Sequence, residues 1–130
     1  MLVTSIPQYI QGLTNAKVDL TNTNNTTLYT APSDSDFNAS VINSLLVSND
    51  SGSADTITVT ITDSDSAVFS VYKLEEVGAL STKELLSNDL IMQGGEVLKV
   101  QAATGARLHV IASIQELTKT RITTSALANI

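Results

Sequence analysis

An unbroken alternation of threonine with aliphatic residues at positions 56–62 is the feature that most constrains the fold. The segment puts Ile57, Val59 and Ile61 on one side of an extended chain and four threonines on the other. Successive side chains of a β-strand point to opposite faces, so this pattern is typical of a strand with one buried face. It predicts a sheet that packs against a second apolar layer.

Similar short runs, separated by Ser, Asn, Asp and Gly turns, recur along the chain. We expect a strand at 39–48, with Val41, Leu45 and Val47 on one face in a parity broken only by Asn43. It should form a hairpin with the strand at 56–62 through the turn at 49–53. A further strand at 67–74 completes a meander.

The C-terminal half predicts a second hairpin, between residues 96–102 and 107–116 around Thr104-Gly105. In its last strand alternate positions are apolar and predict the core face; they are Leu108, Val110, Ala112 and Ile114. Residues 77–88 suit a short helix or a strand pair, and we favour extended structure. About eight strands result, which predicts an all-β, antiparallel β-sandwich of the jelly-roll or immunoglobulin-like type.

Both ends of the chain lose the strand period, so we expect an N-terminal extended arm at 1–16, the sandwich domain at 17–117 and a C-terminal arm at 118–130. A frayed tail is the alternative for the C-terminal segment. Isolated aliphatic and aromatic residues on a polar arm are candidates for contacts with another subunit. The predicted interface residues are Leu2, Ile6, Tyr9, Ile10, Ile122, Leu127 and Ile130.

Composition excludes several classes of function. A length of 130 residues suits one domain. The net charge of −6 opposes nucleic-acid binding, which needs clustered Lys and Arg. The chain has no cysteine, no signal-peptide pattern and no apolar run long enough to span a membrane. The sequence therefore predicts a soluble protein that is made in a cytoplasm and binds neither nucleic acid nor membrane.

No set of residues converges on catalytic or metal-binding chemistry. The sole histidine, His109, falls on the predicted outer face of a strand, where a surface imidazole is expected. The acidic clusters at 33–36 and 63–65 lack calcium-loop spacing and predict turns. Gly94-Gly95 lacks the following Lys-Ser/Thr of a phosphate loop. We predict no catalytic residues, no metal and no cofactor, and hence no enzyme.

The order of turns and strands resembles that of small β-sandwich virion proteins of tailed bacteriophages, over about residues 26–116. The segments that carry the resemblance are TLYTAP (27–32), VINSLLVSN (41–49), SGSA (51–54), TITVTI (56–61), LIMQGGEVLKVQA (90–102) and IQE (114–116).

The resemblance implies a structural role in the virion, in which capsid decoration (a cement protein) is our first hypothesis. It also implies a homo-oligomer, a dimer or trimer, that binds the major capsid protein or other virion proteins. A tail, neck or fibre-attachment protein is the nearest alternative. A carbohydrate-binding adhesive module and a hydrolase are the others; the first needs exposed aromatic residues, and only 4% of the chain is aromatic.

Overall fold

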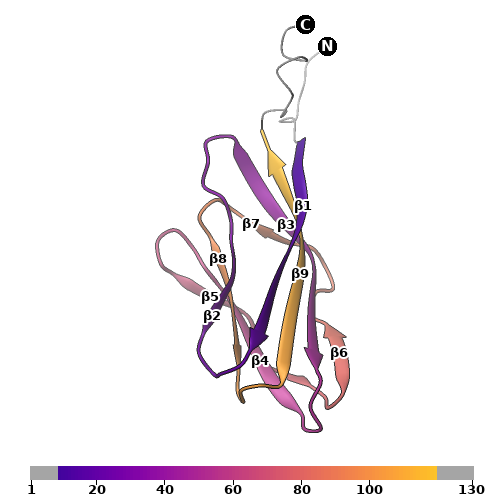
Figure 1. The fold of residues 1–130 in the computed structure, drawn as a ribbon. Helices are drawn as coiled ribbons and strands as arrows, with labels where there is room; N and C mark the ends of the chain where they lie inside the picture. The colour runs from indigo at the N-terminus through magenta and orange to yellow at the C-terminus, as the bar shows by residue number, and fades with distance from the viewer. Residues whose placement is uncertain (1–8, 120–130) are drawn as a thin grey trace, which may run out of the picture.

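The computed structural model describes residues 9–119, which form two antiparallel β-sheets and no helix (Figure 1). The expectation of an all-β, antiparallel, two-sheet fold is confirmed. The described strands are β1 (Tyr9–Leu20), β2 (Thr26–Thr30), β3 (Phe37–Asn49), β4 (Asp55–Thr62), β5 (Val68–Val77), β6 (Ser81–Glu84), β7 (Leu90–Met92), β8 (Val97–Ala102) and β9 (Leu108–Thr118).

Each sheet has four strand positions. Sheet A has the order β1-β9-β3-β6, and β7 also pairs with β3. β6 borders the C-terminal part of β3, at Leu46–Asn49, and β7 borders the N-terminal part, at Ser40–Ile42. Together β6 and β7 therefore act as one interrupted edge strand. Sheet B has the order β2-β8-β4-β5.

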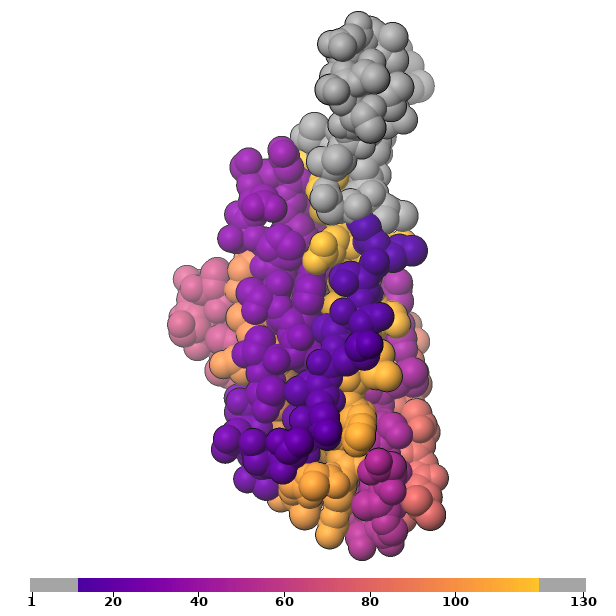
Figure 2. All heavy atoms as spheres, in the orientation of Figure 1, coloured from indigo at the N-terminus to yellow at the C-terminus, as the bar shows by residue number. Residues whose placement is uncertain are grey.

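Strand pairing is nested from the ends of the chain inwards. β1 pairs with β9, β2 with β8, β3 with β6 and β7, and β4 with β5. The centre of this nest is the turn between β4 and β5, where Asp63 Oδ1 accepts hydrogen bonds from the amides of Asp65 and Ala67, each at 2.9 Å. This turn projects from the body at the left of Figure 2. The described chain is thus one long antiparallel ribbon wound into two layers.

The core lies between the sheets and follows the predicted alternation. Ile57 and Val59 in β4 are fully buried, and Ile61 is partly buried against them. The predicted inward face of β9 is also confirmed, because all four of its residues are at most 2% exposed. The largest fully buried side chains are Leu20, Ile42, Leu45, Val47, Ile57, Val59, Val77, Met92, Leu98, Val100, Leu108 and Ile114.

The predicted inward face of β3 is wrong in its first half. The pairing with β9 passes from Ile42↔Ile114 directly to Ser44↔Ser113, so Asn43 is the extra residue of a β-bulge. A bulge reverses the alternation. Ile42 therefore enters the core before the bulge and Leu45 after it, whereas Val41 lies on the outer side with Ile91.

Two of the predicted hairpins are connections between sheets. β3 lies in sheet A and β4 in sheet B, and β8 and β9 are divided in the same way. Turn residues fix the length and shape of a connection but not the strand that lies next to it, so a short turn serves a hairpin or a sheet crossing equally well. The hairpin between β4 and β5 is present. Residues 77–88 contain the extended β6, as expected.

The structure also moves the boundary of the N-terminal arm. Tyr9–Leu20 is one 12-residue strand paired with β9, so residues 9–16 belong to sheet A. The strand period is hard to recognise here, because the apolar Leu13 is exposed (74%) whereas the polar Thr14 pairs with the buried Ile114. Thr118, predicted to begin the C-terminal arm, is the last residue of β9. Within residues 9–119, no helix that could cross a membrane was found.

Candidate functional site

One polar cluster joins the two sheets. Tyr29 in β2 of sheet B places its hydroxyl 2.5 Å from Glu116 Oε2 and 2.7 Å from Ser40 Oγ, both of which belong to sheet A. Ser40 is fully buried, and the other two residues are partly buried. A hydroxyl between two sheets of a sandwich satisfies buried polar groups that would otherwise cost stability.

The electrostatics of this cluster favour a neutral tyrosine. Burial raises the pKa of Tyr29 above its ordinary value of 10.0, and the hydrogen bond to the Glu116 carboxylate raises it further. A general base or nucleophile needs a pKa close to the working pH. The shift at Tyr29 is in the opposite direction, so the cluster is built as a structural link.

A second polar cluster fastens β6 to β3 near the bulge. The Glu84 carboxylate accepts hydrogen bonds from the Ser44 hydroxyl, from the Leu45 amide at 2.7 Å and from the Leu86 amide at 3.1 Å. Partial burial acts to raise the pKa of Glu84, but these donors outweigh it, and the pKa lies below its ordinary value of 4.5. The carboxylate replaces backbone pairing at the point where β6 ends.

The connection from β3 to β4 is organised by a buried amide. Asn49, 1% exposed, donates from Nδ2 to the carbonyls of Ser53 (2.9 Å) and Val77 (3.1 Å). Its Oδ1 accepts from the amide of Ser51 at 3.0 Å and from its hydroxyl at 2.8 Å. All polar atoms of this side chain therefore have partners within the fold.

His109 lies on the outer face of sheet A, as predicted. Its Nε2 is 3.6 Å from both Asp19 Oδ1 and Asp50 Oδ2, and all three side chains are more than 40% exposed. Exposed charges at this spacing contribute little energy. Among residues 9–119, no group of three or more His, Cys, Asp and Glu could hold a metal ion.

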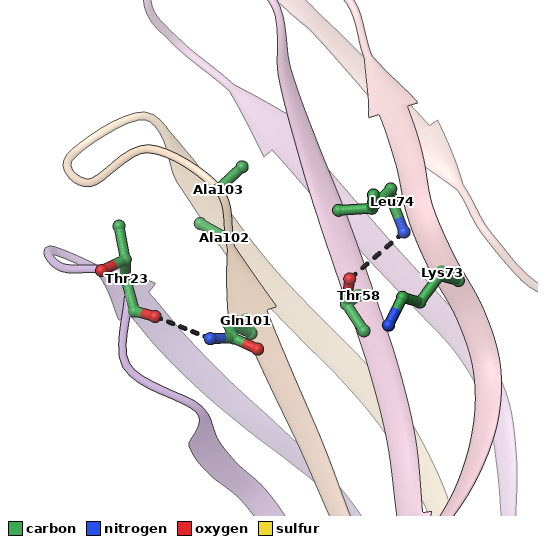
Figure 3. A pocket seen from close by; sticks show the side chains of 7 residues that line it. All are labelled: Thr23, Thr58, Lys73, Leu74, Gln101, Ala102 and Ala103. Carbon is green, nitrogen blue, oxygen red and sulfur yellow. Dashed lines mark hydrogen bonds between the residues drawn. The ribbon is translucent and has the colours of Figure 1, made fainter.

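A hollow of about 380 Å³ lies on the outer face of sheet B (Figure 3). Lys73 and Leu74 border it on one side, and Gln101 borders it on the other, where its amide donates to the carbonyl of Thr23 at 2.9 Å. On the floor, Thr58 Oγ1 accepts from the amide of Leu74, whose φ is +53°. The hollow is shallow and contains one cation and no aromatic ring.

The aromatic residues offer little surface for stacking on sugars. Tyr72 is partly buried and donates to the carbonyl of Leu85, and Phe37 is buried. Of the aromatic side chains that the structure describes, Phe69 is the most exposed, at 58%.

Most of the predicted interface residues fall outside residues 9–119. Leu2, Ile6, Ile122, Leu127 and Ile130 lie outside the described residues. Tyr9 and Ile10 begin β1, where their backbones pair with Thr118 and Leu117 of β9.

The outer face of sheet A carries exposed aliphatic residues that the sequence pattern did not predict. Large aliphatic side chains on this face are exposed: Leu13 (74%), Ile91 (58%), Ile111 (40%) and Leu46 (36%). One signal was available in the sequence, because Ile111 lies at an outward position of β9 between the polar outward residues His109 and Ser113.

Comparison with protein-family models, with curated proteins and with solved structures gives no match for this chain.

Proposed function

We propose that the protein is a non-enzymatic structural component of a tailed-phage virion that decorates the exterior of the capsid. The observation that carries the proposal is the pairing of Tyr9 with Thr118, which brings the first and last parts of the described chain together at one end of sheet A. The sequence resemblance over residues 26–116 supplies the class of protein.

The proposed fold type is a jelly roll. Its support is the nested pairing of β1 with β9, β2 with β8, β3 with β6 and β7, and β4 with β5, if β6 and β7 count as one interrupted strand. Jelly rolls recur in viral capsid proteins and in lectins. A fold of this type is therefore compatible with a virion role without requiring one.

The common exit point of the two ends supports a clamp. Tyr9 and Thr118 lie side by side on neighbouring strands. We propose that the segments continuing from these strands, 1–8 and 120–130, bind the same neighbour in an assembly. Two linked contacts bind far more tightly than either alone, because the first sets a high effective concentration for the second. The proposed contacts are Leu2 and Ile6 from one segment, and Ile122, Leu127 and Ile130 from the other, on the major capsid protein or another virion protein.

The polar clusters within the described residues support a structural role. The groups around Tyr29, Glu84 and Asn49 each join separate parts of the fold and have partners there. A catalytic centre needs a nucleophile, base and stabilising donors around one shared space. The hollow on sheet B is lined by Lys73, Gln101 and threonines, which do not make that set.

The test is co-sedimentation of the purified protein with the emptied capsids of its phage. Decoration predicts binding in a fixed ratio to the major capsid protein, and loss of binding when residues 120–130 are removed. The truncation begins after Lys119, whose amide bonds the Asp36 carbonyl at 2.7 Å, so β9 stays intact and the circular-dichroism spectrum should not change. Binding to isolated tails instead of capsids would favour the alternative, a tail or neck protein. Binding to neither, with binding on a glycan array, would favour the adhesive module.

A further inference from the structure

Among the described strands, β1 forms the longest regular edge of the sandwich. Within residues 9–119 it pairs on one side only, with β9, and the pairs run in unbroken register from Gly12↔Glu116 to Leu20↔Leu108. The other side of such a strand presents a row of N–H and C=O groups that can pair with another chain. The regular part of β1 can therefore accept a further strand.

The other three edges have features that block strand addition. In sheet A, the opposite edge is divided between β6 and β7, of four and three residues. In sheet B, β2 has five residues and a register shift, and β5 has two register shifts and Leu74 at a φ of +53°. Short strands, bulges and inward-pointing charges protect natural sheet edges. The regular part of β1 has none of these, because its charged residues, Lys17 and Asp19, are exposed and alternate with residues that pack on the core.

Residues 120–130 have the length and the sequence pattern of a strand that fits this edge. The segment has 11 residues, without proline or glycine. In an extended chain, alternate residues fall on opposite sides. The first side is Ile122, Thr124, Ala126 and Ala128, and the second is Arg121, Thr123, Ser125 and Leu127.

We propose that residues 120–130 of one copy of the chain add to the free edge of β1 in a second copy, as an antiparallel strand. In the proposed register, Arg121 lies opposite Asp19, so that opposite charges are paired on the outer face of sheet A. Leu127 then lies opposite Leu13, which is 74% exposed in the single chain. Directly opposite side chains of an antiparallel pair share a face, and such pairs stabilise sheets.

The inner face fits the same register. Ile122 lies opposite Val18, which packs partly against the core. A shift by one residue would turn Ile122 to the outer face. A shift by two would either set Arg121 beside Lys17 or move it past Leu20, the last residue of β1. The proposed register is therefore the one that satisfies both faces.

The donor of the added strand must be another copy. Thr118 pairs with Tyr9, at the start of β1, so β9 ends there. Asp19 is near the other end of β1, about 33 Å away along the strand. Three residues span at most about 11 Å, so Arg121 cannot reach Asp19 of its own chain from Thr118.

This inference rests on the proposed function in one respect, because it names the neighbour that residues 120–130 bind as a second copy of the same protein. The short connection brings the Tyr9 end of the donor close to the Asp19 end of the acceptor. The two copies therefore contribute different surfaces to the contact. Contacts of this heterologous kind build rings or open chains.

The first experiment mixes two single-cysteine variants, since the wild-type chain has no cysteine. Leu13→Cys and Leu127→Cys lie opposite each other in the proposed register, at about 5 Å between Cα atoms, which a disulfide can span. Mild oxidation of the mixture should give a covalent dimer of the two variants on a non-reducing gel, and neither variant alone should give one. Lys17→Cys is the matched control for Leu13→Cys, because it lies on the same face of β1 about 13 Å further along and should not link to Leu127→Cys.

The second experiment measures mass by sedimentation equilibrium. The full chain is expected above its chain mass of 13.7 kDa, and removal of residues 120–130 should leave a monomer. Asp19→Arg and Arg121→Asp should each raise the dissociation constant about fivefold, and the two changes together should restore it, because they exchange the charges of one cross-strand pair. Asp50→Arg is the control, since Asp50 also lies 3.6 Å from His109 but is not part of β1, and it should leave the constant unchanged.

Three results would overturn strand addition. They are a monomeric full chain, equal linking of Leu13→Cys and Lys17→Cys to Leu127→Cys, and self-association that survives removal of residues 120–130. Loss of capsid binding in Leu13→Asp with unchanged self-association would also overturn it, because the edge of β1 would then bind a capsid protein.

The same measurements separate this inference from the virion role. Copies that link through Leu13→Cys and Leu127→Cys but ignore capsids would refute decoration and keep strand addition. Capsid binding by a protein that stays monomeric and unlinked would refute strand addition and keep decoration.

Discussion

The hydroxyl of Tyr29 in β2 lies 2.5 Å from Oε2 of Glu116 in β9, so a single hydrogen bond ties the edge strand of one sheet to an inner strand of the other. Ser40, fully buried in β3, bonds the same hydroxyl. Three strands therefore meet at one phenolic oxygen.

Tyr29→Phe should destabilise the fold by about 1–3 kcal/mol, because it leaves a carboxylate and a buried hydroxyl without this partner. Urea unfolding followed by circular dichroism measures the change. Thr27→Ala, at an exposed position of the same strand, serves as the control and should stay within about 0.5 kcal/mol of wild type. Equal midpoints for all three proteins would show that the link contributes nothing.

The same tyrosine should make stability sensitive to alkaline pH. Its folded-state pKa is raised above 10.0, first by burial and then by Glu116. Above pH 10 the unfolded chain releases this proton before the folded chain does, so the stabilisation is complete below that pH and declines as pH rises further. Denaturant midpoints between pH 9 and pH 11 should fall more steeply for wild type than for Tyr29→Phe. Parallel curves would contradict the assignment.

Glu84 should make the stability of the fold sensitive to acidic pH. Its folded-state pKa is lowered, because the hydrogen bonds from Ser44 and the two amides outweigh partial burial. The stabilisation is therefore present above pH 4.5 and is lost as pH falls through the folded pKa. Glu84→Gln should remove this part of the acid dependence, which thermal melts between pH 3 and pH 6 would reveal. An unchanged acid profile would show that the carboxylate is free in solution.

Asn49→Ala should cost about 3 kcal/mol, since it removes an amide with partners on both its oxygen and its nitrogen in a site 1% exposed. Asn43→Ala is the comparison within the same strand, because Asn43 is exposed at the bulge. Chemical unfolding of the two variants should separate them clearly. Similar losses at both positions would mean that the β3 to β4 connection does not depend on the buried amide.

Gly105 and Gly52 allow a matched test of how closely two backbone segments approach each other. A Cβ at Gly105 would lie 2.7 Å from the carbonyl oxygen of Thr21, whereas one at Gly52 would meet nothing within 4 Å. Gly105→Ala should therefore destabilise by about 1–3 kcal/mol, the usual cost of overpacking. Gly52→Ala should change stability by no more than about 0.5 kcal/mol. Thermal melts of both variants give the comparison, and the reverse order would refute the close approach.

The sequence predicted which face of a strand is buried better than it predicted which strands pair. Ile57 and Val59 alternate with threonines, and burial of one face follows directly from that period. The partner of each strand depends on distant contacts, which is why the turns at 49–53 and 103–107 suggested hairpins although they cross between sheets. The bulge at Asn43 reverses the alternation within β3. Its one sign in the sequence is that Asn43 is a polar residue at a position where the period of Val41, Leu45 and Val47 predicts an apolar one.

The exposed aliphatic residues on the outer face of sheet A were even harder to predict from the sequence. An aliphatic residue at an outward strand position, such as Ile111, becomes informative only when its neighbours Leu46 and Lys17 are known, and these come from strands far apart in the sequence. The interface residues at the chain ends were predicted for a different reason, because they are isolated apolar side chains in polar segments. They stay predictions.

The pairing of β1 with β9 has a consequence for how the protein is made. Sheet A cannot close on the ribosome until β9 has been synthesised, and until then one long flank of β3 has no neighbour. Pairings between distant segments make folding slow, on the order of milliseconds to seconds for all-β domains, and expose strand edges that aggregate. Shielding of the nascent chain by a chaperone would matter most in the interval before its final strand emerges.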